Sequence, residues 1–341
     1  MRKTFIPFFT AAMLFICLTA ASAAESPRFP VPDTVSSETQ KLIAAAPMPS
    51  WSQRPKTNAE WKAFVKVFSD QAEAFLPSLR ELMGVTVAKS EMGGVPVYTI
   101  TPRTLPAENA DRVLLNFHGG GYVLGPGESG TPEAILMAGI GKYRVIMPDY
   151  RMAPDHPYPA AMDDVLAVYK ELLKTTPATK IGVFGTSTGG GMTLALILRA
   201  KAEGLPLPAA IGAGTPWSDL TKTGDTYFTN DHVDNVLVSY EGWLGAAAMA
   251  YAAGHDLKDP MLSPVYGDVS EFPPALLTSG TRDLFLSNTV RMHLKLREAG
   301  VDADLFVFEG LSHAQYHMDP AAPETRFHFT ELARHFSRHL Q

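Results

Sequence analysis

Two short glycine-bearing motifs contain the residues whose types and spacing could do chemistry. HGGGY occupies residues 118–122, and GTSTG occupies residues 185–189. The second motif follows the apolar run at residues 181–184, which predicts a buried strand, and precedes residues 189–202, which predict a helix. A serine at a tight turn between a strand and a helix holds its hydroxyl out from the backbone. We therefore predict that Ser187 is a nucleophile.

The glycines of this motif have a steric reason. A nucleophile on so sharp a turn adopts a strained backbone, and side chains at Gly185 or Gly189 would collide with neighbouring elements. A serine hydroxyl is also a poor nucleophile near neutral pH, so it needs a base, and the base needs an acid to orient it.

The acid and the base are expected later in the chain, in the order serine, acid, histidine. Asp283 comes directly after the apolar run at residues 275–277, and His313 comes after residues 305–308, the last predicted strand. Loops at the carboxyl ends of the strands in an open α/β sheet converge on one site. We therefore expect Asp283 and His313 to meet Ser187.

Three residues rival these assignments. His317 is the alternative base, although its position four residues after His313 places it beyond the loop. Asp268 and Glu309 are alternative acids, but only Asp283 combines the end of a strand with a following helix.

The HGGGY motif follows residues 113–117, another predicted strand. Its glycines allow backbone N–H groups to face an oxygen that gains negative charge. We assign Gly119 and Gly120 as donors of such an oxyanion hole, with the N–H of Thr188 as the third. We expect His118 to shape its loop and not to transfer protons.

From about residue 85 to the C-terminus, the chain resembles the hormone-sensitive-lipase-like branch of the α/β-hydrolases, which includes many bacterial carboxylesterases. The resemblance rests on HGGGY, on PDYRMAPDHPYPAAMDD at residues 148–164, on GTSTGG, and on the loops of Asp283 and His313 in the expected order. Asp149, Arg151 and the two acids at 163 and 164 are expected to hold a turn and to cap the helix that begins at residue 160.

The resemblance implies a carboxylic-ester hydrolase that needs no cofactor. The commonest motif around the serine in this family is GDSAGG, whereas this chain has Thr186 and Thr188; a branch with threonine at the first position is similar. The branched side chain of Thr188 is expected to narrow the pocket.

A lactonase or amidase would use the same triad, and a non-catalytic ligand-binding relative is a third reading. A lipase for long chains is less favoured, because no long apolar lid stands out.

The N-terminus has the pattern of a secretory signal. Arg2 and Lys3 precede a mostly apolar stretch, residues 5–18, and small residues at 21–23 favour cleavage after Ala23. We expect an exported protein, periplasmic or secreted. An uncleaved anchor is the alternative, but the stretch is short of the ~20 residues that span a bilayer.

Cysteine and charge exclude several functions. Cys17 is the single cysteine and lies in the signal, so the mature chain has no disulfide, thiol nucleophile or cysteine-ligated metal. The net charge of −6 becomes −8 after cleavage, and the basic residues are dispersed except at 326–339, so nucleic acid is not an expected partner. The remaining partner is a small-molecule ester. A homodimer through the last strand or helix stays open, because no residue pattern specifies it.

The C-terminal basic stretch, residues 326–339, predicts an amphipathic helix. His328, His335 and His339 are expected to be packed or solvated, since no HExxH pattern marks them as ligands, and no metal is predicted.

The predicted elements alternate between strands and helices, which indicates an α/β fold with a mainly parallel sheet. Gly93 and Gly94 predict a hairpin between the first two strands, hence an antiparallel start. The eight predicted strands are residues 85–89, 95–101, 113–117, 145–147, 181–184, 209–213, 275–277 and 305–308.

Two segments outside this alternation, residues 34–83 and about 215–264, are expected to be helical and to form a cap. Their aromatic residues are expected to roof an acyl pocket as a group. The expected organisation is a signal peptide at 1–23, N-terminal cap helices and linker at 24–84, and an α/β-hydrolase domain at 85–341. The aromatic residues are Trp51, Trp61, Phe64, Phe68, Phe75, Trp217, Tyr227, Phe228, Trp243 and Tyr251.

Overall fold

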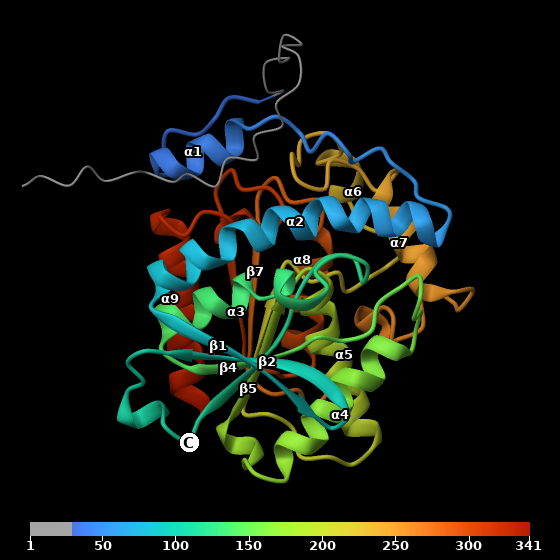
Figure 1. The fold of residues 1–341 in the computed structure, drawn as a ribbon. Coiled ribbons are helices and arrows are strands. Elements are labelled where there is room, and N and C mark those ends of the chain that lie inside the picture. The colour runs from blue at the N-terminus through green and yellow to red at the C-terminus, as the bar shows by residue number, and fades with distance from the viewer. Residues whose placement is uncertain (1–28) are drawn as a thin grey trace, which may run out of the picture.

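The computed structural model of the protein describes residues 29–341, so the predicted signal segment and Cys17 lie outside the described residues. One eight-stranded sheet runs through the centre, with helices on both faces (Figure 1). The strands are β1 (Val85–Met92), β2 (Val95–Pro102), β3 (Val113–Phe117), β4 (Arg144–Pro148), β5 (Ile181–Thr186), β6 (Ala210–Gly214), β7 (Ala275–Gly280) and β8 (Ala303–Phe308).

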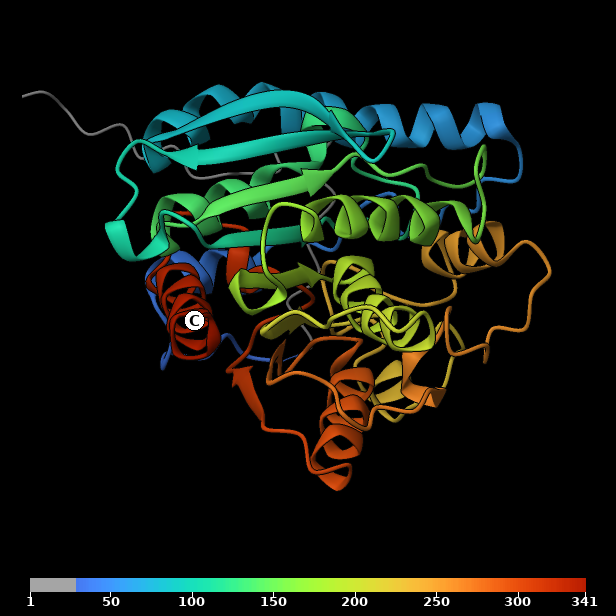
Figure 2. The same cartoon turned by 90° about the horizontal axis from the view of Figure 1, so that it is seen from below.

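The strand order is β1-β2-β4-β3-β5-β6-β7-β8, and Figure 2 shows β1 and β8 at opposite edges. β1 pairs antiparallel with β2, and β2 with β4, whereas every later pairing is parallel. The predicted antiparallel start of a mainly parallel sheet is confirmed. Gly93 and Gly94 form the hairpin turn with φ values of 62° and 81°, which favour glycine.

The central strands are buried on both faces, which explains their continuous apolar sequences. Every residue of β3 and β5 is buried. Leu114 packs into one hydrophobic core, and its neighbour Leu115 packs into the other. The strand period of two therefore divides β3 between two layers of helices.

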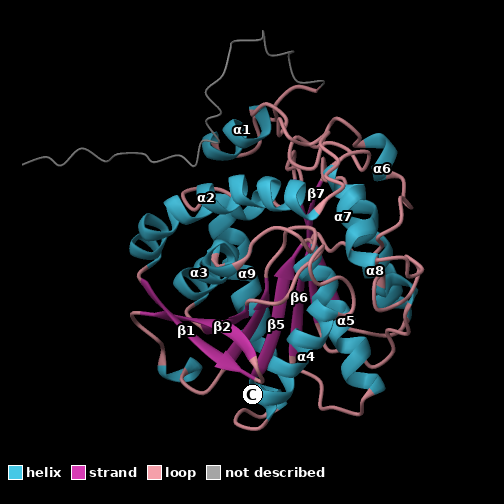
Figure 3. Cartoon of the chain, turned by 45° about the vertical axis from the view of Figure 1, so that its right-hand side comes forward, coloured by secondary structure: helices cyan, strands magenta, loops and turns pink. Residues whose placement is uncertain are grey.

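Figure 3 shows these two layers on either side of the sheet. One core includes buried side chains from α4, α5 and α8, and the other includes side chains from α3 and α9. The bounds of these helices are α3 (Pro132–Leu136), α4 (Ala160–Leu173), α5 (Thr188–Ala202), α8 (Leu286–Glu298) and α9 (Pro323–His339).

The two segments outside the alternation gather above the sheet in Figure 1. The first contains α1 (Ser37–Ala44) and α2 (Asn58–Met83), and a capping box between Thr57 and Glu60 begins α2. The second contains only two short α-helices, α6 (Thr226–Thr229) and α7 (Trp243–Ala252), and is otherwise mainly turns and loops. The prediction of a helical segment is therefore wrong for most of residues 215–264, where Thr, Asp, Asn and Gly favour turns.

Within residues 29–341, no helix has both the length and the apolar character needed to cross a bilayer.

Candidate active site

The turn between β5 and α5 carries Ser187 in a strained backbone conformation. Its φ is 63° and its ψ is −122°, a combination that L side chains rarely adopt. A Cβ atom at either Gly185 or Gly189 would collide with the carbonyl oxygen of Phe117 in β3. The steric prediction for both glycines is confirmed, and the half-buried Ser187 faces a cavity.

Asp283 and His313 form a hydrogen-bonded pair. The Nδ1 atom of His313 lies 3.0 Å from Oδ1 of Asp283, which is fully buried. The same carboxylate oxygen accepts the backbone N–H of Phe285 at 2.8 Å. The other oxygen accepts the hydroxyls of Ser279, at 2.9 Å, and of Thr215. With Nδ1 donating to Asp283, Nε2 of His313 is left to accept a proton, which is the tautomer that a general base requires.

Ser187 and His313 line the same cavity. Among the described residues, no hydrogen bond joins the Ser187 hydroxyl to the imidazole. Such bonds are often long in ligand-free enzymes and tighten when substrate binds.

The rivals for the acid and base lack these contacts. His317 is half-buried and also lines the cavity, and burial together with His313 lowers its pKa to about 4. It makes no hydrogen bond to a carboxylate in the described part of the chain. Asp268 pairs with Lys201 at 3.3 Å at the surface, and Glu309 is exposed.

The three predicted oxyanion donors lie around the same turn. A Cβ atom at Gly119 would be 2.9 Å from the carbonyl oxygen of Thr186, and Gly120 has a φ of 121°, so both positions favour glycine. In the described chain, no backbone hydrogen bond uses the N–H of either glycine. Thr188 is the first residue of α5, where N–H groups lack helical acceptors and the helix dipole favours negative charge. Its side chain is fully buried and lies outside the cavity lining, so the expected narrowing of the pocket is wrong.

His118 shapes the glycine loop, as its position predicts. Its Nδ1 lies 2.8 Å from the carbonyl oxygen of Gly119, and its ring stacks on Tyr150 with 4.2 Å between centroids. The Tyr150 hydroxyl donates to the His118 carbonyl at 2.8 Å. Burial lowers the pKa of His118, so the ring is a neutral structural group near neutral pH.

The charged residues of the long matched block hold a turn, but they do not cap α4. Asp164 accepts the backbone N–H of Arg151 at 2.8 Å and its guanidinium at 2.7 Å. Asp149 accepts a backbone N–H from the neighbouring loop, and Asp163 forms an ion pair with α5. The capping prediction is wrong, because Pro159 is the N-cap residue and offers no side-chain oxygen.

The cavity at Ser187 has a volume of about 680 Å³. Of the aromatic residues expected to roof it, only Phe68, Phe75 and Trp243 line it. The others mainly pack helices and loops together, and Phe228 is 63% exposed. The prediction that these aromatic residues roof the pocket as a group is therefore wrong. The aliphatic lining comes from Met48, Leu124, Val236, Leu237 and Met318, among others.

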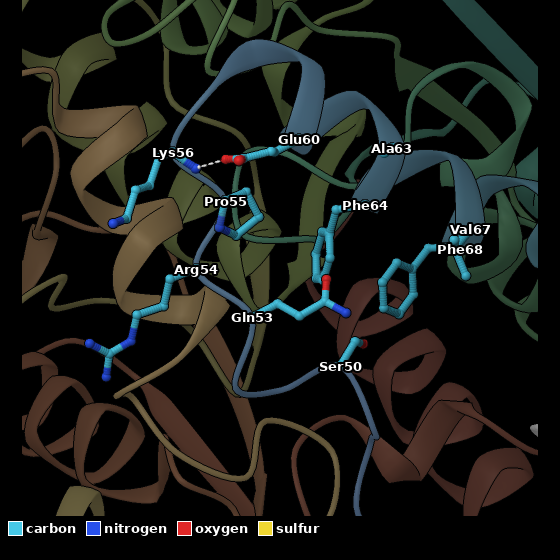
Figure 4. Close-up of a pocket in the computed structure, with 10 residues that line it drawn as sticks. All are labelled: Ser50, Gln53, Arg54, Pro55, Lys56, Glu60, Ala63, Phe64, Val67 and Phe68. Carbon is cyan, nitrogen blue, oxygen red and sulfur yellow. Dashed lines mark hydrogen bonds between the residues drawn. The ribbon is translucent and has the colours of Figure 1, made fainter.

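A second hollow of about 620 Å³ lies between residues 50–56 and the first turns of α2 (Figure 4). Phe68 lines both hollows, so they adjoin at this ring. In Figure 4 the charged ends of Arg54 and Lys56 lie on the opposite side of Pro55 from the phenyl rings.

A further acid that the sequence did not indicate, Glu133 on α3, is buried and lines the cavity. Its carboxylate accepts the Thr186 hydroxyl at 2.7 Å and the Asn116 amide at 3.2 Å. Burial raises the pKa of Glu133 to about 7. Nothing local in the sequence distinguishes this acid from an ordinary residue in the first turn of a helix.

Of the three histidines of α9, two are buried and His339 is half-buried. His328 and His335 are buried and packed against aromatic rings. Across residues 29–341, no group of three or more His, Cys, Asp or Glu side chains could hold a metal ion.

Comparisons with known proteins agree with the observed fold. A family model described as the alpha/beta hydrolase fold matches residues 114–317. The chain is 30% identical to an acetyl-hydrolase from Streptomyces hygroscopicus over 65% of this chain and 74% of that protein. It is 29% identical to an esterase from Acinetobacter venetianus over 66% of this chain and 74% of that protein.

Two solved structures are also similar. The crystal structure of an esterase, E25, has 43% sequence identity and a TM-score of 0.89, covering 94% of this chain and 99% of that one. An esterase from the bacterial hormone-sensitive lipase family has 26% identity and a TM-score of 0.75, covering 84% of this chain and 93% of that one.

Proposed function

Since the chain belongs to the hormone-sensitive-lipase-like carboxylesterases of the α/β-hydrolase fold, we propose that it hydrolyses short to medium acyl esters through Ser187, His313 and Asp283. The observation that carries this proposal is the buried Asp283–His313 pair, whose histidine lines the same cavity as the strained Ser187. Each of the three comes from a different loop at the carboxyl end of a strand.

In the proposed mechanism, Nε2 of His313 takes the hydroxyl proton while Ser187 attacks the ester carbonyl. Asp283 holds the ring in the required tautomer and stabilises the imidazolium. The N–H groups of Gly119, Gly120 and Thr188 bind the oxygen that becomes negative. The alcohol leaves with the proton from His313, and water then hydrolyses the acyl-enzyme by the same steps.

The preference for short to medium chains is supported by the size and lining of the cavity. A volume of about 680 Å³ suits a small ligand, and apolar side chains from both cap segments surround it. No step requires a metal or an organic cofactor.

The test combines one substitution with a substrate series. Ser187→Ala should lower ester turnover by roughly four orders of magnitude or more while the fold is retained, because the nucleophile is lost. Nitrophenyl esters of increasing chain length should give the highest kcat/KM for short to medium acyl groups. Near-normal activity of the variant would reject the proposal. Turnover confined to lactones or amides in a wider panel would replace the ester assignment.

A further inference from the structure

A second buried carboxylate, Asp234, lies beside the Asp283–His313 pair. It belongs to the loop between α6 and α7, far from both partners in sequence, and none of its surface is exposed. Its Oδ2 atom accepts two backbone N–H groups, from Leu284 at 2.9 Å and from His313 at 3.2 Å. A single oxygen atom of Asp234 therefore links the backbone of Leu284, the residue after Asp283, to the backbone of His313.

The other oxygen of Asp234 fixes its own loop. Oδ1 accepts the N–H groups of Val236 at 2.8 Å and Leu237 at 3.0 Å, and both of these residues line the cavity. The carboxylate thus connects the loop after β7, the loop after β8 and the cavity wall. A group that accepts four N–H bonds has no acceptor to spare, so shortening or neutralising it breaks contacts in at least one of these segments.

Two neighbours of Asp234 in the same segment, Asn230 and Asn235, also bind the loops of Asp283 and His313. The Asn230 amide donates to the carbonyl oxygen of Asp283 at 2.8 Å. The backbone N–H of Asn235 donates to the hydroxyl of Ser312, directly before His313, at 3.1 Å. Residues 230–235 therefore hold both the acid loop and the base loop.

The charge of Asp234 also acts on the pair. Burial and the nearby Asp283 carboxylate raise the pKa of Asp234 to about 6, while His313 opposes that rise. Asp283 on the loop after β7 and His313 on the loop after β8 are the ionisable groups that act on Asp234 from the packed elements. An ionised Asp234 stabilises a protonated His313, which is the form that builds up as the serine attacks.

We propose that Asp234 is a positioning residue for ester hydrolysis, which sets the spacing of Asp283 and His313 through their backbones and adds a second negative charge beside the imidazole. This inference rests on the proposed function. It assigns the irregular segment between α6 and α7 a role in assembling the catalytic residues as well as in covering the cavity.

The test compares two substitutions at this position with a control in the same segment. Asp234→Asn keeps the shape but replaces one accepting oxygen by an NH₂ group and removes the charge. Asp234→Glu keeps the charge but shifts the carboxylate by one methylene. Asp225→Asn is the control, because Asp225 is exposed and its side chain has no hydrogen bond or ion pair within the described residues.

Both Asp234 variants should lose roughly 10- to 100-fold in kcat with KM changed by less than about threefold, since misplacement of the base acts on chemistry more than on binding. The acid limb of kcat/KM should move to lower pH in Asp234→Asn, because the imidazolium loses a nearby negative charge. That limb should stay in place in Asp234→Glu. The control should match the wild type in both respects.

Wild-type kcat in a folded Asp234→Asn or Asp234→Glu protein would overturn the proposal, as would an unmoved acid limb in Asp234→Asn. A measurement on the unaltered protein covers the case in which both variants fail to fold. The amide protons of Leu284 and His313 should exchange as slowly as those of β7, and rapid exchange of both would also overturn it. Near-normal ester turnover by Ser187→Ala would reject the proposed function, whereas the results at Asp234 bear only on the role of that residue. The two failures are therefore distinguishable.

Discussion

Ser187 is connected to a buried acid through a single residue. Thr186 precedes the nucleophile, and its hydroxyl bonds both to Glu133 and, at 3.1 Å, to the hydroxyl of Tyr316. A charged Glu133 would accept the hydroxyl of Thr186, but it would also place a poorly solvated negative charge at the cavity wall. Burial raises the pKa of Glu133 to about 7, so the protonated and the charged form of this carboxyl are both populated near neutral pH.

The sequence could indicate Ser187, Asp283 and His313, because each follows an apolar strand and the order of the three is characteristic. It could not indicate Glu133, Asp234 or Thr215. Their contacts are made across long stretches of chain, and each has an ordinary sequence neighbourhood. Only the folded structure shows that their side chains are buried at the site.

Glu133 gives the protein a measurable pH dependence of stability. Its pKa in the folded state is about 7, raised by burial from 4.5, so its contribution to stability is fully present below about pH 4.5 and is lost as pH rises through 7. The loss should be on the order of 3 kcal/mol. Glu133→Gln cannot titrate, so the free energy of unfolding of the wild type relative to this variant should fall between about pH 4.5 and about pH 8.

Urea unfolding of both proteins across that range measures the difference. Parallel pH profiles of the two proteins would contradict the assigned environment of Glu133.

At the scale of elements, the loops that follow β3, β5, β7 and β8 supply the candidate residues, and the cap segments supply the cavity wall. The start of α7 is a clear case. Trp243 lines the cavity, and its ring lies 2.8 Å from the position that a Cβ atom at Gly121 would occupy. Phe64 of α2 packs against the same ring, with 5.8 Å between centroids. A glycine in the HGGGY loop thus makes room for a cap aromatic.

Trp243→Leu should widen the cavity and shift the acyl preference to longer chains. The ratio of kcat/KM for a longer ester to that for a short one should rise by roughly 10-fold, because a few extra methylenes find space in an apolar site. Nitrophenyl esters of two chain lengths measure this ratio.

Phe228→Ala is the matched control for this substitution, since Phe228 lies in the same segment but is exposed and does not line the cavity. An equal shift in both variants, or no shift in Trp243→Leu, would show that the wall at Trp243 does not set chain length.

At the scale of the whole molecule, the sheet was predictable and the cap was less so. Continuous apolar runs between helices specify the strands, and the double glycine specifies the hairpin. The observed strands extend past several predicted ends, as β5 does to Thr186, because backbone pairing continues after the apolar residues stop. In residues 215–264 no periodic pattern guides a prediction, and aromatic residues there pack in several directions.

Three histidines whose pKa values lie below the ordinary value should make the molecule sensitive to acid. Burial lowers the pKa of His317 and of His335 to about 4, and that of His328 to about 3. Their contribution to stability is present above pH 6.5 and is lost as pH falls through these lower values, because the unfolded chain binds the protons first. This effect is opposite in sign to that of Glu133.

His328→Phe removes one of these groups and keeps a ring beside Tyr316, whose ring centroid lies 4.4 Å from that of His328. The decline in the free energy of unfolding between about pH 6.5 and about pH 4 should be shallower in this variant. Guanidinium unfolding at several pH values measures the slope. An unchanged slope would mean that His328 does not titrate as its burial implies.

The catalytic assignment of Ser187, His313 and the oxyanion donors is tested most directly by a crystal structure of the protein after reaction with a nitrophenyl phosphonate, which mimics the tetrahedral intermediate. We expect a phosphorus atom bonded to Oγ of Ser187 and a phosphonyl oxygen about 2.7–3.1 Å from the N–H groups of Gly119, Gly120 and Thr188. Nε2 of His313 should lie within hydrogen-bond distance of the adduct. An unmodified Ser187, or an adduct whose oxygen faces away from these N–H groups, would contradict it.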